Sequence, residues 1–235
     1  MNTLKISQII SFEDLENIQT NNLKENETIV FFTSYKTKFK DSLLNKYQSF
    51  LTHEFVQKTN RFKRWEDQNN ALFGKLLVYA GYYYLTGQKI DFLNYKTNLN
   101  GKPFIEGSNL EFNISHTQKT VVCAFNLEKI GIDIEQIQNI EYKNFITIFS
   151  DEEMQKINKN DIYKFYEFWT KKESLSKAIG KGLTLPLKEI NVLTDTINYK
   201  KSVFKYYNFI WNDIYCTIAI KSKIKNKINW IEIKF

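Results

Sequence analysis

The sequence has few of the residues that interrupt or cross-link a chain. Its 235 residues include only two prolines, eight glycines and two cysteines. Long linkers and disordered segments are usually rich in proline and glycine, so their scarcity argues against such segments. Cys123 and Cys216 both lie in apolar runs, without the Cys or His spacing of a zinc site. We expect both to be reduced core residues.

Long apolar runs are also lacking. No stretch approaches the length needed to cross a membrane, and polar residues interrupt the start, MNTLKISQIISFEDLE, too soon for the core of a signal peptide. Internal repeats and low-complexity tracts are absent as well. These absences predict a cytoplasmic protein without membrane contact.

The residues that are abundant fit a folded protein with an anionic partner. Hydrophobic residues make up 43% of the chain and aromatic residues 16%, enough for one large domain or for two lobes of about 110 residues. The formal net charge of +7 indicates an anionic partner. A nucleic acid, a phosphorylated small molecule and an acidic protein all remain open on charge alone.

The pattern of apolar residues predicts strands and helices in alternation. Strands are expected at 29–34, 110–114, 120–126, 130–135, 203–210, 214–221 and 228–234, and helices at 41–58, 66–86, 151–158 and 161–179. The order lacks a strict βαβ rhythm, which favours the α+β class with mixed sheets. The turn-rich segment 98–109 predicts a boundary between an N-terminal lobe, 1–108, and a C-terminal lobe, 109–235.

The segment GIDIE, residues 131–135, places two carboxylates on one face of an expected strand. Alternation puts Ile132 and Ile134 on one side and Asp133 and Glu135 on the other, roughly 7 Å apart. Such repulsion is tolerable if the face is solvated or if a cation lies between the charges. A lone D-x-E pattern is more often a solvated strand face, so this segment needs a second observation.

The helix expected over 161–179 provides that observation. At 100° per residue, Glu173 falls within the core-facing stripe formed by Ile162, Phe165, Tyr166, Trp169 and Ser176. Lys172 and Lys177 flank the stripe, whereas Lys171 and Ala178 are expected to point away. A buried carboxylate needs a cation, and three carboxylates without His or Cys suit Mg²⁺, with Mn²⁺ as the alternative. The flanking lysines would then hold a substrate phosphate.

These residues resemble a known family. The spacing from GIDIE to FWTKKESLSKAIGKGL closely resembles the signature of 4′-phosphopantetheinyl transferases, and NGKPF and FNISHT resemble two further motifs in the same order. The length resembles the two-lobed, surfactin-synthetase-activating type. The resemblance implies a monomeric pseudo-dimer of two similar lobes, each a mixed or antiparallel sheet packed with helices, with the active site between them. It also implies transfer of the 4′-phosphopantetheine arm of coenzyme A to a serine of an apo acyl or peptidyl carrier, with release of adenosine 3′,5′-bisphosphate.

The resemblance also implies roles for individual residues. Asp133, Glu135 and Glu173 match the magnesium ligands, Lys177 matches the lysine on the pyrophosphate, and Lys172 matches its basic companion. Ser115 and His116 match the pair that touches coenzyme A phosphates, and Lys102 matches a further coenzyme A contact. Lys58 and Arg61 match only part of a basic cluster on the 3′-phosphate, because Asn70 stands near where many members have arginine.

Glu153 has two competing interpretations. It matches a family glutamate and is our candidate for the general base that deprotonates the carrier serine, with a water on the cation as the alternative base. It also follows Ser150 by three residues, which is the spacing of a helix capping box.

Several candidate residues have ordinary structural explanations. His116 alone could be a histidine at a strand end, Lys102 could be a turn lysine, and Trp169 is expected in the core. His53 matches no motif and is given no role.

Two rival functions remain. The chief rival is a basic nucleic-acid-binding protein without catalysis, supported only by the charge and the aromatic content. No RRM, KH or zinc signature is present, and such a protein would not need Glu173 in an apolar stripe. The second rival keeps the coenzyme A or magnesium chemistry but uses another acceptor. The positive charge also fits an acidic carrier and polyanionic coenzyme A, so we expect no nucleic-acid partner.

Overall fold

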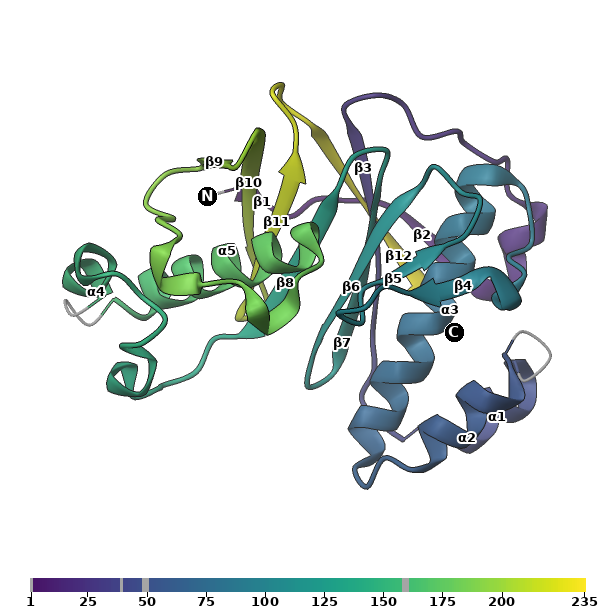
Figure 1. Ribbon diagram of the computed structural model, residues 1–235. Helices are drawn as coiled ribbons and strands as arrows, with labels where there is room; N and C mark the ends of the chain where they lie inside the picture. Colours follow the sequence, from purple (N-terminus) through teal and green to yellow (C-terminus); the bar gives the residue numbers. More distant parts are fainter. Residues whose placement is uncertain (1, 39, 48–50, 158–160) are drawn as a thin grey trace.

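Two five-stranded sheets pack face to face, and each is covered on its outer side by one long helix (Figure 1). The structure is a computed structural model that describes residues 2–38, 40–47, 51–157 and 161–235. The β8 sheet contains β1 (Asn2–Thr3), β9 (Thr196–Tyr199), β10 (Ser202–Trp211), β11 (Ile214–Lys221) and β8 (Ile130–Gln136). The β3 sheet contains β2 (Ile6–Ser11), β12 (Lys227–Lys234), β3 (Glu27–Ser34), β7 (Thr120–Asn126) and β6 (Glu111–Thr117).

The helices lie on the outer faces of these sheets. In Figure 1, α5 (Ile162–Ile179) lies on the left over the β8 sheet, and α3 (Trp65–Thr86) lies on the right over the β3 sheet. The remaining α-helices are α1 (Lys40–Tyr47), α2 (His53–Asn60) and α4 (Asp151–Ile157), and the 3₁₀ turns are η1 (Phe12–Asn17), η3 (Phe92–Asn94), η4 (Tyr142–Phe145), η5 (Gly182–Thr184) and η6 (Leu187–Glu189). A small hairpin of β4 (Tyr95–Thr97) and β5 (Pro103–Ile105) completes the described elements.

Alternation along the strands explains this layering. In β3, Ile29 and Phe31 belong to the core beneath α3, whereas Val30 and Phe32 belong to the core between the two sheets. A strand buried on both faces reads as a continuous apolar run, which is why IVFF is a strong strand signal. The mixed sheets and the two helix-covered layers confirm the α+β class and the two-lobed architecture.

Most of the expected elements are present. All seven expected strands form, as do the helices expected at 66–86 and 161–179. The helix expected at 151–158 forms over Asp151–Ile157, and residue 158 lies outside the described residues. The helices of the described chain include none that is both long and apolar enough to span a bilayer.

The single helix expected over 41–58 is wrong. The structure has α1 and α2 instead, because Thr52 is extended, with φ −73° and ψ 148°, and its side chain accepts a hydrogen bond from the amide of Phe55. Thr52 therefore caps a new helix. Residues 48–50 of the expected helix lie outside the described residues.

Each sheet contains strands from both the N-terminal and the C-terminal part of the chain. Residues 127–129 carry the chain from the β3 sheet into the β8 sheet, so β7 pairs with the N-terminal strand β3 and β6 pairs with β7. Strand β12 then returns to the β3 sheet, where it lies between β2 and β3 in parallel pairing with both. The predicted boundary at 108/109 falls in the connection between β5 and β6, and as a domain division it stays a prediction.

Side chains of β6 join the two sheets at their common edge. Asn113 Oδ1 accepts a hydrogen bond from the amide of Ile132 at 2.9 Å, and Ser115 Oγ accepts one from the amide of Ile134 at 3.3 Å. The outer amides of β8 thus bond to side chains of β6 in place of a neighbouring strand, which satisfies donors that would otherwise be buried without a partner. This seam between β6 and β8 brings residues of both sheets within contact distance.

Lys75 of α3 is buried among aromatic rings. Its Nζ lies 3.0 Å from the ring centroid of Tyr95 and 4.8 Å from that of Phe92, and the side chain forms no ion pair within the described residues. Burial, with a smaller contribution from the charge of Lys58, lowers the pKa of Lys75 to about 7. The rings offer a cation–π contact, but this lysine is easier to deprotonate in the folded state than in the unfolded chain.

We expect this lysine to make stability depend on pH. Its folded-state pKa is lowered from 10.5 to about 7, so between these values the unfolded chain binds more protons and the free energy of unfolding rises with pH. Each pKa unit corresponds to about 1.4 kcal/mol, so we expect a rise of a few kcal/mol that Lys75→Met removes. Denaturant titrations of both proteins from pH 6.5 to 10 measure it. If the free energy of unfolding depended on pH in the same way in both proteins, the rings would keep the ammonium charged.

Candidate active site at the seam between the sheets

The acidic face of β8 points toward α5. Ile132 and Ile134 lie in the core between the sheets, while Asp133 and Glu135 project from the opposite face. The predicted alternation is therefore confirmed. The carboxylate face is not an open solvated face, because Asp133 is buried and Glu135 is half-buried.

Gly131 determines how closely α5 approaches this face. A Cβ atom built on Gly131 would lie 2.0 Å from the carbonyl oxygen of Ser174 and 2.4 Å from the backbone nitrogen of Ala178. No side chain fits there, so the glycine allows the helix backbone to lie directly against β8. The expectation that Ala178 points away is wrong, because this residue is buried at the contact. The approach places Glu173 and Lys177 beside the acidic strand.

Asp133, Lys177 and Ser115 form a polar cluster at the seam. Lys177 Nζ donates to Asp133 Oδ1 at 2.6 Å and to Ser115 Oγ at 2.9 Å, and Ser115 Oγ also donates to Asp133 Oδ1 at 3.2 Å. Ser115 comes from β6, Asp133 from β8 and Lys177 from α5, so strands of both sheets contribute. Asp133 Oδ2 is buried without a hydrogen-bond partner among the described residues.

The other two carboxylates lie near this cluster. Glu135 Oε1 accepts a hydrogen bond from Trp169 Nε1 at 2.9 Å, whereas Glu173 has no hydrogen bond or ion pair within the described part of the chain. The indole hydrogen bond was not expected, because Trp169 was interpreted only as a core aromatic residue.

The pKa values show that negative charge in this cluster is poorly compensated. Burial raises the pKa of Glu135 to about 7, and repulsion from Asp133 and Glu173 adds to the effect. Burial and Asp133 raise the pKa of Glu173. The pKa of Asp133 is also raised by burial, although Lys177 and Ser115 oppose the shift. One ammonium group does not balance three carboxylates.

The donor set fits a divalent cation. The described residues contain no three His, Cys, Asp or Glu side chains already arranged as a metal centre. Asp133 Oδ1 is held by Lys177 and Glu135 by Trp169, but Asp133 Oδ2 is an orphaned buried acceptor and Glu173 has no partner among the described residues. Three hard oxygen donors with excess negative charge suit Mg²⁺ or Mn²⁺.

A cavity of about 250 Å³ lies next to the acidic cluster. Its lining includes Arg64, Asn70, His116 and Glu135, which come from the start of α3, from β6 and from β8. The pKa of His116 is lowered because the ring is partly removed from water and lies near Lys177. The lining also includes Glu66 and Asp67, so the cavity combines a guanidinium and an imidazole with three carboxylates, of which Glu135 belongs to the acidic cluster.

Arg64 was missed by the sequence analysis. Lys58 and Arg61, the predicted 3′-phosphate ligands, are exposed and do not line this cavity, whereas Arg64 does. All three lie in one basic run before α3. Arg64 differs from the other two in its position relative to the helix, because it is the N-cap residue of α3 and so lies at the helix end that faces the cavity. A coenzyme A contact of Lys58 or Arg61 stays a prediction.

Lys102 holds α5 in place. Its ammonium donates to the carbonyl oxygens of Ile130 and Ala178 and pairs with Glu111 at 3.2 Å, and its side chain is only 13% exposed. A cation at the C-terminal end of a helix is also favoured by the helix dipole. This bonding argues for a structural role in this conformation, and direct contact with coenzyme A stays a prediction.

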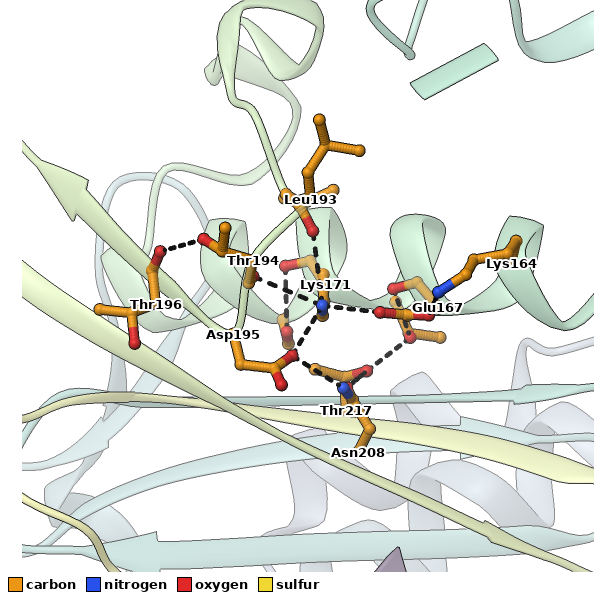
Figure 2. A network of polar contacts seen from close by, with 12 residues as sticks. Lys164, Glu167, Lys171, Leu193, Thr194, Asp195, Thr196, Asn208 and Thr217 are labelled. Carbon is orange, nitrogen blue, oxygen red and sulfur yellow. Dashed lines mark hydrogen bonds and ion pairs between the residues drawn. The ribbon is translucent and has the colours of Figure 1, made fainter. Parts of the chain in front are cut away.

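Lys171 anchors the opposite side of α5 (Figure 2). Its Nζ lies 2.8 Å from Glu167 Oε1 and 2.8 Å from Asp195 Oδ1, and it also donates to the carbonyl oxygens of Val192 and Thr194. The expectation that Lys171 points away from the core is wrong, because its side chain is 1% exposed. The helix is therefore held from both sides, which limits how far Glu173 and Lys177 can move.

Lys172 and Glu153 form an ion pair in the interior. Lys172 Nζ lies 2.9 Å from Glu153 Oε2, both side chains are 0% exposed, and Lys172 also donates to the carbonyl oxygens of Leu187 and Ile190. Burial lowers the pKa of Lys172, and Glu153 opposes the shift. These bonds argue for a structural role of Lys172, because its ammonium is fully bonded inside the protein, and the phosphate contact stays a prediction.

Glu153 closes a capping box. Its Oε2 accepts from the amide of Ser150 at 2.8 Å, the Ser150 hydroxyl accepts from the amide of Glu153 at 3.2 Å, and Oε1 accepts from the amide of Val192 at 2.9 Å. A general base must reach the proton that it removes. The capping-box interpretation is therefore confirmed. This environment argues for a structural role of Glu153, and its role as general base stays a prediction.

The chain matches proteins of one family along most of its length. Residues 129–216 match the model described as the 4′-phosphopantetheinyl transferase superfamily, and residues 38–128 match the one described as 4′-phosphopantetheinyl transferase, N-terminal. The chain is 30% identical over 180 residues to the 4′-phosphopantetheinyl transferase gsp of Aneurinibacillus migulanus, which covers 74% of this chain and 76% of that protein. It is 36% identical over 155 residues to the 4′-phosphopantetheinyl transferase Sfp of Bacillus subtilis strain 168, covering 63% of this chain and 68% of that protein.

The chain therefore belongs to the 4′-phosphopantetheinyl transferase family and is an enzyme of that class. The resemblance read from GIDIE and the WTKKES segment is confirmed. The two family models meet between residues 128 and 129, which is also where the chain passes from the β3 sheet to the β8 sheet.

The buried pair gives a test of its structural role. Glu153→Gln keeps the cap but leaves the Lys172 ammonium without its carboxylate, so we expect a loss of about 3–5 kcal/mol in the free energy of unfolding. The double variant Glu153→Gln with Lys172→Met removes both charges and should regain most of that loss. Denaturant unfolding of both variants measures the effect.

Turnover by the double variant separates the two roles of Glu153. We expect kcat close to that of the wild type, because neither side chain reaches solvent. A stably folded double variant whose kcat falls by about 10²–10⁴ would support Glu153 as the general base.

Proposed function

We propose that this enzyme transfers the 4′-phosphopantetheine arm of coenzyme A to a serine of an apo acyl or peptidyl carrier protein and releases adenosine 3′,5′-bisphosphate. The observation that carries the proposal is the cluster of Asp133, Glu135 and Glu173 with Lys177, next to a cavity that contains Arg64 and His116. Carboxylates that can bind a cation lie there next to positively charged groups that can bind a polyphosphate.

The three carboxylates would hold a divalent cation, Mg²⁺ or Mn²⁺, which when bound supplies positive charge against the pyrophosphate and the leaving bisphosphate. The excess negative charge of the cluster and the orphaned Asp133 Oδ2 support this assignment. Glu135 and Glu173 complete the set from a strand and a helix that Gly131 brings together.

Lys177 is the residue that we assign to the pyrophosphate. Its side chain is 28% exposed, so the ammonium can rotate from Asp133 toward a ligand without crossing the core. Lys171 and Lys172 cannot do this, because their ammonium groups are buried and fully bonded on other sides of α5. A lysine that already carries its charge beside the reacting phosphorus can stabilise the charge that develops on the leaving group.

Arg64 and His116 are placed to bind a further phosphate of coenzyme A. The guanidinium of Arg64 presents several donors and pairs only loosely with Glu66, at 3.6 Å. His116 lies on the same cavity and is exposed. Ser115, predicted as a phosphate contact, bonds Asp133 and Lys177, so we assign it to the orientation of Lys177.

The finer features of the protein follow from the same site. The positive net charge favours an acidic carrier as well as coenzyme A. Because β6, β8 and α5 of one chain supply the polar cluster, a monomer suffices for activity. Transfer of this kind uses cytoplasmic substrates, so we propose a cytoplasmic enzyme.

Intact-mass analysis tests the activity directly. We expect the enzyme, coenzyme A and Mg²⁺ to add one phosphopantetheine to an apo-carrier of the fatty-acid, polyketide or nonribosomal-peptide type, and to add nothing to a carrier whose serine is alanine. Glu173→Gln should need much more Mg²⁺ for half-maximal rate, whereas Glu152→Gln, which alters an exposed carboxylate of the same lobe, should not.

Each control result bears on a different part of the proposal. Transfer that persists after exhaustive treatment with EDTA would exclude the cation. An unchanged Mg²⁺ titration for Glu173→Gln would exclude the three-carboxylate site. Failure to modify any carrier class would point to another acceptor.

A further inference from the structure

Asn70 connects three polar groups behind the cavity. It is buried in α3, its Oδ1 accepts a hydrogen bond from the Tyr35 hydroxyl at 2.7 Å, and its Nδ2 lies 3.4 Å from the carbonyl oxygen of Thr117. The same Nδ2 lies 3.3 Å from His116 Nδ1. Asn70 is thus the buried contact of the one histidine that lines the described cavity.

The backbone at Thr117 decides which way the amide of Asn70 faces. A carbonyl oxygen only accepts hydrogen bonds, so the NH₂ group belongs on the side of Thr117 and His116. The opposite orientation would place the amide oxygen against that carbonyl oxygen. On the other side, the Tyr35 hydroxyl lies 2.7 Å from Oδ1 and also faces the carbonyl oxygens of Glu66 and Gln118, so its single proton has three acceptors and the orientation of the amide rests on Thr117.

This orientation settles the protonation of His116. A nitrogen that receives the Asn70 NH₂ hydrogen must be the unprotonated one, so Nδ1 is the acceptor and the proton of the neutral ring is on Nε2. The lowered pKa of His116 also favours the neutral ring. Within the part of the chain that the structure describes, Nε2–H has no hydrogen-bond partner and is available as a donor.

We propose that Asn70 is a positioning residue that holds His116 as the Nε2–H tautomer, so that His116 offers a neutral hydrogen-bond donor to a phosphate oxygen of coenzyme A. The tautomer follows from contacts within the protein, whereas its use on coenzyme A rests on the proposed function. In this arrangement Arg64 supplies the positive charge of the cavity, and His116 supplies a hydrogen-bond donor of fixed orientation.

Nuclear magnetic resonance can read the tautomer directly, because the chain has two histidines. Long-range ¹H–¹⁵N spectra of the ligand-free protein at pH 7.5 give a separate pattern for each ring, and His53→Gln assigns them. We expect His116 to show one protonated Nε2 and an unprotonated Nδ1. A protonated Nδ1 on His116 would overturn the proposal.

Variants of Asn70 test whether this residue is the cause. Asn70→Leu removes the donor, so the His116 pattern should move toward the free-ring average, and Asn70→Asp should draw the proton to Nδ1. Asn69→Ala is the matched control, because Asn69 is the preceding buried amide of α3 but bonds to Thr37. A His116 pattern that is the same in the wild type and in Asn70→Leu would contradict the assignment.

Calorimetry with coenzyme A tests the consequence for binding. We expect Asn70→Asp to raise the Kd for coenzyme A by at least tenfold relative to the wild type and Asn69→Ala to change it little. Equal affinities in the wild type and Asn70→Asp would overturn the positioning role. A wild type that shows the Nε2–H tautomer but does not bind coenzyme A would instead refute the proposed function.

Discussion

The contact between α5 and β8 at Gly131 is the constraint on which the rest of the site depends. With no Cβ at this position, the backbone of α5 at Ser174 and Ala178 lies directly against the strand. The helix then places Glu173 and Lys177 at the level of Asp133 and Glu135, and β6 adds Ser115 from the other sheet. A larger side chain would separate helix and strand and move Glu173 and Lys177 away from the acidic strand.

Buried lysines fix the orientation of that helix. Lys171 bonds toward the 192–195 segment, Lys172 toward Glu153, and Lys102 toward the last turn of α5. Buried ion pairs add little net stability, because desolvation offsets most of the attraction, but breaking one leaves an uncompensated charge. Rotation of α5 would break several such bonds at once. We therefore infer that these pairs hold the catalytic face of the helix in register with β8.

Sequence patterns predicted the secondary-structure elements and the acidic cluster better than they predicted the environments of the lysines. Alternation in GIDIE and the position of Glu173 on the helix depend only on local geometry, which sequence spacing encodes directly. The helical wheel failed for Lys171 and Ala178 because it assumes one buried face, whereas α5 is packed on most of its circumference. The ion pair of Glu153 and Lys172 was not predicted for a similar reason: spacing does not reveal which charged side chains pair inside the core. Likewise, only the fold shows that Arg64, rather than Lys58 or Arg61, lies on the cavity.

The central claim is that one cation and the phosphates of coenzyme A meet at this seam. The most direct measurement is a crystal structure with Mn²⁺ and coenzyme A, using the anomalous signal of manganese to locate the ion. We expect a single strong peak among the carboxylates of Asp133, Glu135 and Glu173, with the pyrophosphate of coenzyme A beside Lys177. Coenzyme A bound elsewhere, or bound at the seam with the manganese peak outside these three carboxylates, would contradict the account.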